Sequence, residues 1–168
     1  FSFDSLTELE KLAACAPGSS VMCRVLASSE GASWPLSKKF GCDFETALDL
    51  LQLAAKRGLK PYGLSFHVGS QQQNPYAWDI ALSELAQLVS SLGAKGIDLE
   101  VINIGGGLPA QYQEEIPTLE TFAETIQTAL HAYMPGIKVM LEPGRSLVAD
   151  AGVIQSEVVL VSQKSKDD

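Results

Sequence analysis

The chain has 168 residues, of which 46% are hydrophobic and 19% are charged, as in an ordinary globular protein that can bury a core. Its net charge of -8 argues against a nucleic-acid surface, which needs clustered Lys and Arg side chains. No stretch approaches the roughly 20 apolar residues that span a bilayer, and the N-terminus lacks the order of a signal peptide, so we expect a soluble, cytoplasmic protein.

Short apolar segments alternate with amphipathic ones along most of the chain. The apolar segments that predict strands are 1–3, 20–27, 61–68, 99–104 and 137–142. The amphipathic segments that predict helices are 43–58, 74–96 and 118–133. Strands of this length that alternate with helices are typical of parallel βα units, so the fold class is α/β. The small, polar segment 27–34 is expected to be a mobile loop.

Polar residues close successive strands at an interval of about 40 residues, which is the length of one βα unit. They are Arg24, His67, Gly105 and Glu142. In a TIM barrel, functional groups lie at the C-terminal ends of the strands, and all four positions fall there. A doubly wound sheet fits the same alternation, so the topology stays open at this point.

The pattern changes after Asp150. Residues 1–150 hold about five predicted strands, which would make a partial TIM (β/α)8 barrel if the barrel topology applies, since a closed barrel has eight. Residues 151–168 are rich in Val and Ile and have no helix behind them, which predicts the first strand of a β-rich domain followed by a solvated tail.

Three consecutive glycines, Gly105, Gly106 and Gly107, follow the fourth predicted strand. Their backbone N–H groups can form an anion-binding nest, and the absent side chains let a phosphate approach closely. The alternative is a tight turn that is rich in glycine for structural reasons alone.

The sequence "EPGR" places Glu142 at a strand end and Arg145 just beyond a turn. Arg24 also falls at a strand end, where a guanidinium group suits phosphate or carboxylate. The alternative for this motif is a structural ion pair between Glu142 and Arg145.

The sequence "SFHVGS" ends a strand with His67 and continues with Gly69 and Ser70, a second small turn with a hydroxyl donor. A structural histidine is the alternative. Two distant histidines, no clustered carboxylates and three cysteines without CxxC spacing indicate neither a metal site nor a disulfide framework. A serine nucleophile is not indicated, because there is no GxSxG motif. A glycine cradle, an acid, an imidazole and two arginines together suit a phosphorylated cofactor or substrate.

In this order, the stretches "CRV", "PLSKKFG", "SFHVGS", "INIGGGLP" and "LEPGRSLV" resemble the fold-type III pyridoxal-phosphate decarboxylases. These enzymes act on ornithine, lysine, diaminopimelate or arginine, and "SFHVGS" with "KKFG" looks most similar to the ornithine decarboxylase branch. The resemblance covers most of the chain. It implies that residues 1–150 belong to a barrel domain like that of alanine racemase and bind pyridoxal 5'-phosphate.

Carried over by position, the resemblance assigns the cofactor site to Arg24, His67, Ser70, Gly105, Gly106, Gly107, Glu142, Gly144 and Arg145. It implies that the glycine run, Ser70 and Arg145 hold the phosphate. It also implies that His67 stacks on the pyridine ring, while Glu142 keeps the ring nitrogen protonated; these two are the expected catalytic residues. Lys39 resembles a lysine that pairs across the interface of the family's dimer, so we expect a homodimer.

The sequence departs from the family in one respect. The family's chemistry needs a lysine on an early strand that forms a Schiff base with the cofactor, and none of the nine lysines occupies such a position. We therefore expect an inactive fragment of an enzyme of polyamine biosynthesis, which converts ornithine or lysine into a diamine and carbon dioxide. The alternatives are a diaminopimelate or arginine decarboxylase, a non-catalytic regulator like the antizyme inhibitors, and an unrelated phosphate-binding barrel enzyme.

Overall fold

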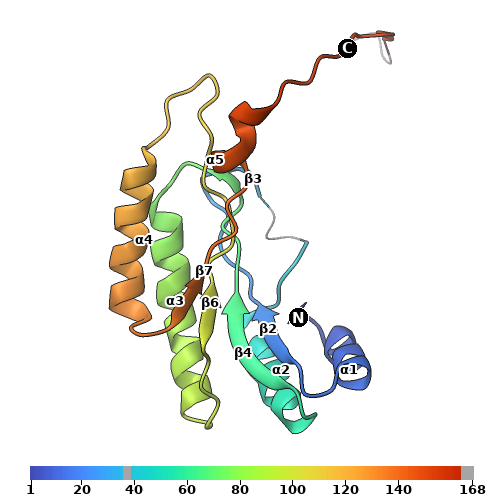
Figure 1. Cartoon of the computed structure of the whole chain (residues 1–168), viewed down its shortest axis with the longest axis vertical. Helices are drawn as coiled ribbons and strands as arrows, with labels where there is room; N and C mark the ends of the chain where they lie inside the picture. Colours follow the sequence, from blue (N-terminus) through green and yellow to red (C-terminus); the bar gives the residue numbers. More distant parts are fainter. Residues whose placement is uncertain (36–38, 164–168) are drawn as a thin grey trace.

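A computed structural model of the chain describes residues 1–35 and 39–163. This part of the chain contains seven strands, five α-helices and one 3-10 helix, with four of the α-helices between successive strands of the main sheet (Figure 1). The strands are β1 (Ser2–Phe3), β2 (Ser20–Arg24), β3 (Ala32–Trp34), β4 (Lys60–Ser65), β5 (Ser70–Gln72), β6 (Val101–Asn103) and β7 (Lys138–Met140). The α-helices are α1 (Leu6–Cys15), α2 (Phe44–Lys56), α3 (Tyr76–Gly93), α4 (Leu119–Tyr133) and α5 (Arg145–Val148), and a 3-10 turn follows at Ala149–Ala151.

The central feature is a parallel sheet of five strands in the order β1-β2-β4-β6-β7. All five predicted strands are confirmed, each at the expected place in the chain. Every new strand is added beside the previous one, so the order never reverses. A doubly wound sheet requires such a reversal. The sequential order is therefore that of part of a TIM barrel, which decides between the two topologies.

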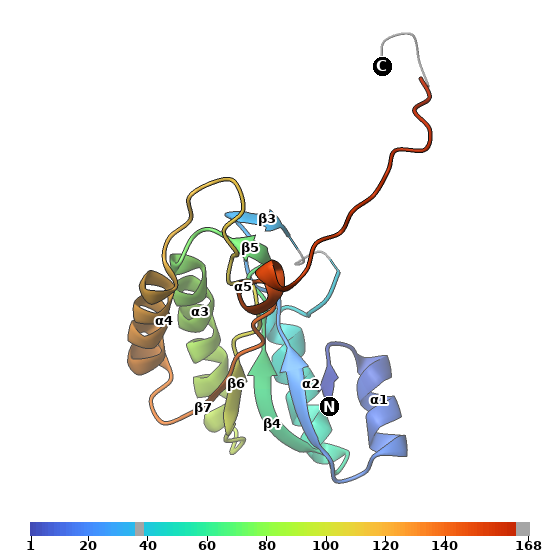
Figure 2. The same cartoon turned by 45° about the horizontal axis from the view of Figure 1, so that its top comes forward.

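The helices α1 to α4 form a layer on one face of the sheet (Figure 2), with consecutive helices in contact. Each helix connects two neighbouring parallel strands, and the right-handed crossover places all of them on the same side. Strand residues that point to this side, such as Val21, Cys23, Leu64 and Ile102, are almost completely buried. Alternate residues therefore point to the opposite, inner face.

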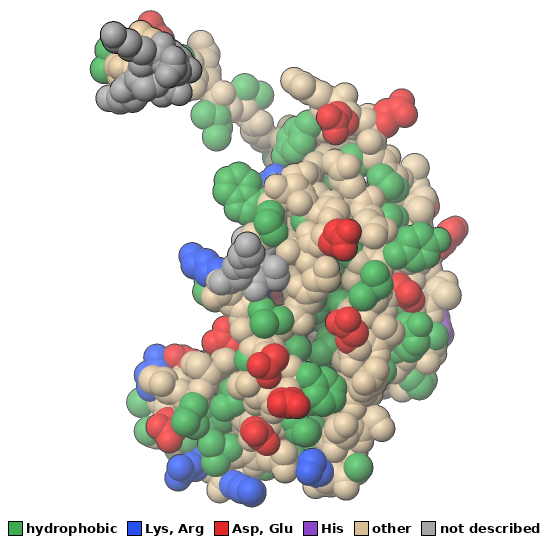
Figure 3. Space-filling view, turned by 180° about the vertical axis from the view of Figure 1, so that it is seen from behind, with side chains coloured by type: hydrophobic (Ala, Val, Ile, Leu, Met, Phe, Trp, Pro, Cys, Tyr) green, Lys and Arg blue, Asp and Glu red, His purple; other side chains and the backbone are tan. Residues whose placement is uncertain are grey.

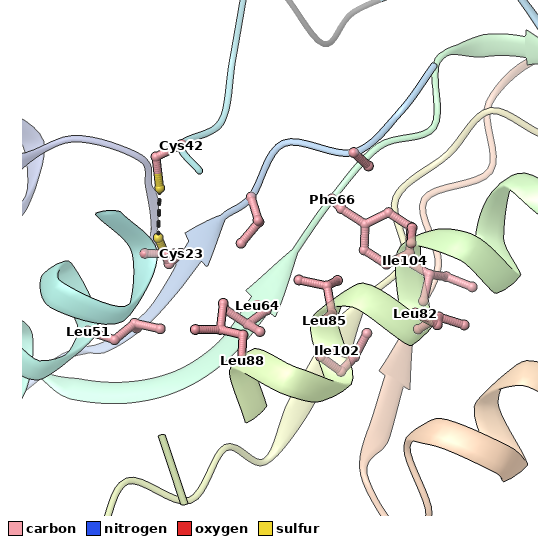
Figure 4. Close-up of a cluster of buried hydrophobic side chains, with 14 of the residues drawn as sticks. Cys23, Cys42, Leu51, Leu64, Phe66, Leu82, Leu85, Leu88, Ile102 and Ile104 are labelled. Atoms are coloured by element: carbon pink, nitrogen blue, oxygen red, sulfur yellow. Dashed lines mark hydrogen bonds between the residues drawn. The ribbon is translucent and has the colours of Figure 1, made fainter. Parts of the chain in front are cut away.

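Figure 4 shows how the helix-facing core is built. Leu82, Leu85 and Leu88 of α3 belong to the same buried cluster as Leu64 of β4 and Ile102 of β6 (Figure 4). A spacing of three residues puts these leucines on the same side of α3. This core fixes the height of α3 against the sheet, and with it the loops that follow β4 and β6.

The expected mobile loop at 27–34 contains a strand, so that prediction was wrong. Ala32 pairs with Gln72 and Trp34 with Ser70, which makes a two-stranded antiparallel sheet of β3 and β5. The Gln72 side chain is completely buried and donates hydrogen bonds to the carbonyl oxygens of Glu30 and Val68, each at 3.0 Å. A buried glutamine with both partners in place holds a segment whose composition alone is that of a loop.

Residues 152–163 are exposed and form no strand in the described part of the chain, although they were predicted to begin a β-rich domain. Apolar residues such as Val153 and Ile154 are 95% exposed there. A strand needs a neighbouring strand for its backbone hydrogen bonds, and no described strand pairs with this segment. The second domain therefore stays a prediction.

The molecular surface shows where charge gathers. On the face shown in Figure 3, acidic side chains are spread widely, and Lys and Arg lie mainly near its margin. No continuous basic patch covers this face. Within residues 1–35 and 39–163, no helix combines the length and apolar character needed to cross a bilayer.

Candidate active site

The C-terminal ends of the parallel strands meet at one edge of the sheet. In the register of the sheet, Arg24 of β2 lies beside Ser65 of β4, and Ser65 lies beside Asn103 of β6. Asn103 in turn lies beside Met140 of β7. The loops that follow these strands therefore start side by side, on the side of the sheet where α5 and β3 lie (Figure 1).

A small cavity of about 180 Å³ opens at this edge. It is lined by Ser2, Met22, Arg24, Ser65, Phe66, His67, Asn103 and Glu142. The structure thus brings together three of the predicted site residues, Arg24, His67 and Glu142, from three different βα units. No lysine lines this cavity among the described residues.

The glycine run packs against two neighbouring loops. An ideal Cβ atom on Gly106 would lie 2.5 Å from the carbonyl oxygen of Glu142 and 3.3 Å from Nε2 of His67. Gly105 and Gly107 adopt φ angles of +66° and +113°, and a Cβ atom on either would collide with the backbone of residues 66–69. All three positions therefore require glycine for packing reasons.

The same loop leaves backbone donors free. The N–H groups of Gly106 and Gly107 donate no hydrogen bond within residues 1–35 and 39–163, although Gly106 is buried. The N–H of Gly105 is occupied, because it donates to Oδ1 of Asn103 at 2.9 Å. A buried N–H without a partner costs free energy, so these two amides suit an anionic group such as a phosphate.

His67 is held in one tautomer. The N–H of Gly69 donates to Nδ1 of His67 at 3.0 Å, so the proton of the neutral ring lies on Nε2, which is near Gly106. Burial holds the pKa of His67 below its usual value, Arg24 acts in the same direction, and Glu142 opposes them. The ring is therefore a flat, neutral group at neutral pH.

Glu142 is fixed at both its backbone and its side chain. Its N–H donates to the carbonyl oxygen of Gly105 at 2.9 Å, and its Oε1 accepts from Nδ2 of Asn103 at 2.8 Å. The side chain remains exposed. The alternative ion pair is not formed, because none of the three ion pairs among the described residues joins Glu142 to Arg145.

Arg24 lies against an aromatic ring. Its Cζ is 5.3 Å from the ring centroid of Phe40, and Nζ of Lys39 is 5.1 Å from the same centroid. Both cations therefore lie against the ring of Phe40, which belongs to the segment that leads into α2. The neighbouring Lys38 of the "KKFG" stretch lies outside the described residues.

Arg145 lies apart from this cavity. It begins α5 and lines a second, polar cavity of about 390 Å³ together with Gln71, Gln73 and Tyr112. Ser70 begins β5, directly before Gln71, and lines neither cavity. Gly144 precedes α5 and is exposed, with open space where a Cβ atom would be. The predicted phosphate anchors are thus divided between the glycine loop and the start of α5.

Sequence reasoning missed Asn103. A polar residue at the end of the short buried strand "VIN" was the available signal, since buried polar groups need defined partners. The described residues contain no group of three or more His, Cys, Asp or Glu side chains that could hold a metal ion.

Comparison with known proteins gives a consistent set of relatives. Residues 1–149 match the family model described as "Pyridoxal-dependent decarboxylase, pyridoxal binding domain". A lysine/ornithine decarboxylase of Selenomonas ruminantium is 33% identical over 160 residues, which are 95% of this chain and 41% of that protein. The chain thus spans about two fifths of the length of this relative.

Solved structures give the same result. A variant of SrLDC in complex with PLP superposes with a TM-score of 0.83 at 34% identity, over 88% of this chain and 38% of that one. A lysine/ornithine decarboxylase from Vibrio vulnificus, complexed with cadaverine, superposes with a TM-score of 0.77 at 32% identity, over 88% of this chain and 38% of that one.

Proposed function

Because the chain belongs to the family of pyridoxal-dependent decarboxylases, we propose that it forms the cofactor-holding part of an enzyme that decarboxylates a basic amino acid. Ornithine and lysine are the substrates proposed, with a diamine and carbon dioxide as products. The names of the relatives support this choice, since lysine/ornithine decarboxylases are among them and one was solved with cadaverine.

The observation that carries the proposal is the meeting of His67, Gly106 and Glu142. They come from the loops after β4, β6 and β7: a Cβ atom on Gly106 would lie 2.5 Å from the backbone carbonyl oxygen of Glu142 and 3.3 Å from Nε2 of His67, and both of these residues line the same cavity. Nothing in the fold of a barrel requires an imidazole, a pair of free amides and an acid at the same place. Together they suit a phosphorylated aromatic ring with a basic nitrogen.

Pyridoxal phosphate, when bound, supplies a ring that takes up the electron pair left behind as carbon dioxide departs. The free amides of Gly106 and Gly107 would hold its phosphate, with Ser70 and Arg145 as further donors. The neutral His67 ring would cover one face of the pyridine ring. Oε2 of Glu142 would accept a hydrogen bond from the protonated ring nitrogen, and Arg24 would add positive charge nearby.

No lysine lines this cavity among residues 1–35 and 39–163, and the amine that anchors the cofactor is proposed to come from a part of the enzyme other than these residues. We also propose a homodimer in the cytoplasm, in which Lys39 pairs with an acidic residue of the second copy. Charge favours this pairing, since the chain carries 20 Asp and Glu against 12 Lys and Arg.

Substitution of Glu142 tests the proposal. In the complete polypeptide that carries this chain, Glu142→Gln removes the negative charge at unchanged size, and we expect decarboxylation of ornithine or lysine to fall by about 100-fold or more. Glu115→Gln, at an exposed loop position, is the matched control and should leave the rate unchanged. Measurement of diamine release gives the rate directly.

Unchanged turnover in Glu142→Gln would remove Glu142 from the mechanism. Titration with pyridoxal phosphate, followed by absorbance, separates the enzyme from a non-catalytic regulator. A regulator needs no cofactor, so saturable binding of pyridoxal phosphate together with turnover supports the proposal of an enzyme. A complete polypeptide that neither binds the cofactor nor turns over substrate contradicts that proposal.

A further inference from the structure

Asn103 lies at the end of β6 with only 3% of its surface exposed. Its neighbours in the strand, Ile102 and Ile104, point into the core beneath α3 (Figure 4). Side chains alternate along a strand, so Asn103 points to the inner face of the sheet, where it lines the candidate cavity. A buried carboxamide is stable only when its polar atoms have partners.

Both ends of the Asn103 side chain have a partner. The N–H of Gly105 can only donate, so it faces Oδ1, at 2.9 Å. The opposite end of the carboxamide is then Nδ2, which donates to Oε1 of Glu142 at 2.8 Å. A carboxylate oxygen only accepts, so the two contacts fix the orientation of the amide without ambiguity.

This arrangement links the acid to the glycine loop. Gly105 contacts the backbone of Glu142 through its carbonyl oxygen and contacts Asn103 through its N–H. Asn103 contacts the Glu142 carboxylate. Oε1 of Glu142 is thereby held, and its Oε2 has no hydrogen-bond partner among the described residues. One carboxylate oxygen is therefore fixed by the protein while the other remains free to accept a proton donor.

We propose that Asn103 is a positioning residue, whose carboxamide aims the Glu142 carboxylate at the ring nitrogen of the cofactor. This inference rests on the proposed function. It requires an amide at position 103, because the side chain must accept from Gly105 and donate to Glu142 at the same time. An aspartate has the same shape but presents an acceptor to Glu142, and two adjacent carboxylates repel each other.

Asn103→Asp in the complete enzyme tests the inference. We expect the Kd for pyridoxal phosphate, measured by fluorescence titration, to rise by about tenfold or more, because Glu142 shares its site with a like charge. We expect kcat to fall by a similar factor, with the KM for the amino acid changed about twofold or less. The matched control is Asn74→Asp, which makes the same change at the only other asparagine. Its Oδ1 accepts from the N–H of Tyr76, as an aspartate also can.

Asn103→Ser is the second variant, in case Asn103→Asp does not fold. A serine hydroxyl can still accept from the N–H two residues ahead, but it is too short to reach Glu142, and it adds no charge. We expect a weaker affinity for pyridoxal phosphate and a lower kcat in this variant also. The thermal midpoint without cofactor, measured on the same samples, shows whether the fold is retained at the assay temperature.

The outcomes separate the inference from the proposed function. Wild-type cofactor affinity and kcat in Asn103→Ser, with strong loss in Glu142→Gln, would overturn the inference and leave the function standing. Wild-type behaviour of Glu142→Gln would overturn the function as well. Loss of affinity and kcat in Asn103→Ser at a retained fold, with Asn74→Asp like the wild type, supports the inference.

Discussion

At the candidate site, close contacts with neighbouring loops require glycine at position 106. Gly106 has no room for a Cβ atom, because the Glu142 carbonyl oxygen and the His67 ring occupy that space. The glycine run is thus explained by packing between three loops, and its free amides are a consequence of the same geometry. Glycine is therefore required for the turn itself, and the same turn leaves the two amides that we propose hold a phosphate.

His67 gives a prediction for stability against pH. Its pKa is lowered in the folded chain by burial, so the folded state binds a proton less readily than the unfolded state does. Its contribution to the free energy of unfolding is therefore fully present above the unfolded pKa of about 6.5 and is lost as the pH falls through the lower folded value. We expect His67→Gln to reduce the drop in urea midpoint between about pH 7.5 and about pH 5.

His131→Gln is the control for that measurement. His131 lies on the exposed side of α4, where Nδ1 contacts the carbonyl oxygen of Gln127 at 2.8 Å. This variant should keep the drop of the wild type. If both variants reduce the drop in urea midpoint equally, or if neither variant reduces it, burial of His67 does not govern the pH dependence of stability.

At the scale of elements, Trp78 joins α3 to its neighbours. Its side chain is completely buried, and its indole N–H donates to the carbonyl oxygen of Ile104 at 3.2 Å. The ring meets Phe122 of α4 edge-on, with 5.7 Å between the centroids. Ile104 directly precedes the glycine run, so this hydrogen bond connects the helix layer to the loop that carries the free amides.

The two tryptophans of the chain give a matched pair of variants. Trp78→Phe removes the donor to Ile104 and leaves a cavity, so we expect the free energy of unfolding to fall by about 2–4 kcal/mol. Trp34 is 65% exposed, and Trp34→Phe should change it by about 0.5 kcal/mol or less. Urea denaturation followed by far-UV circular dichroism measures both, and similar losses would contradict the placement of Trp78.

At the scale of the whole molecule, the sheet is open at both ends. β1 and β7 each pair with one strand only among the described residues, and the edge strand β7 is exposed along its length. Val139 and Met140 are 44% and 43% exposed. Unpaired backbone groups beside apolar side chains are a template for further strands, which a complete barrel would supply from the same polypeptide.

This chain by itself should therefore self-associate. We expect its weight-average mass in sedimentation equilibrium to rise with concentration, and Val139→Lys to shift it toward the monomer because a charge opposes edge-to-edge pairing. Val153→Lys places the same charge in the exposed segment after α5 and should have a smaller effect. A monomer at every concentration, or equal effects of the two lysines, would contradict this role of β7.

The parts of the fold that could be predicted from the sequence are those that depend on residues close together in the chain. The five strands of the sheet and the helices α2, α3 and α4 were predicted, because the hydrophobic periodicity that indicates them involves residues only two to four positions apart. The two-stranded sheet of β3 and β5 was missed, because its stability depends on Gln72, which lies about 40 residues from the loop that it holds.

For the candidate site, the sequence by itself determined which residues lie at or just after the C-terminal ends of the parallel strands, and hence that His67, the glycine run and Glu142 follow strands at one edge. Arg24 ends its strand as predicted, whereas His67, Gly105 and Glu142 lie two residues beyond theirs. Only the tertiary structure decided that each strand lies beside its predecessor, that Asn103 bridges Gly105 and Glu142, and that Arg145 lines a separate cavity. Strand ends are a local property of the chain. Hydrogen-bond partners are chosen across loops from different βα units, whose approach is set by the packing of the helix layer against the sheet.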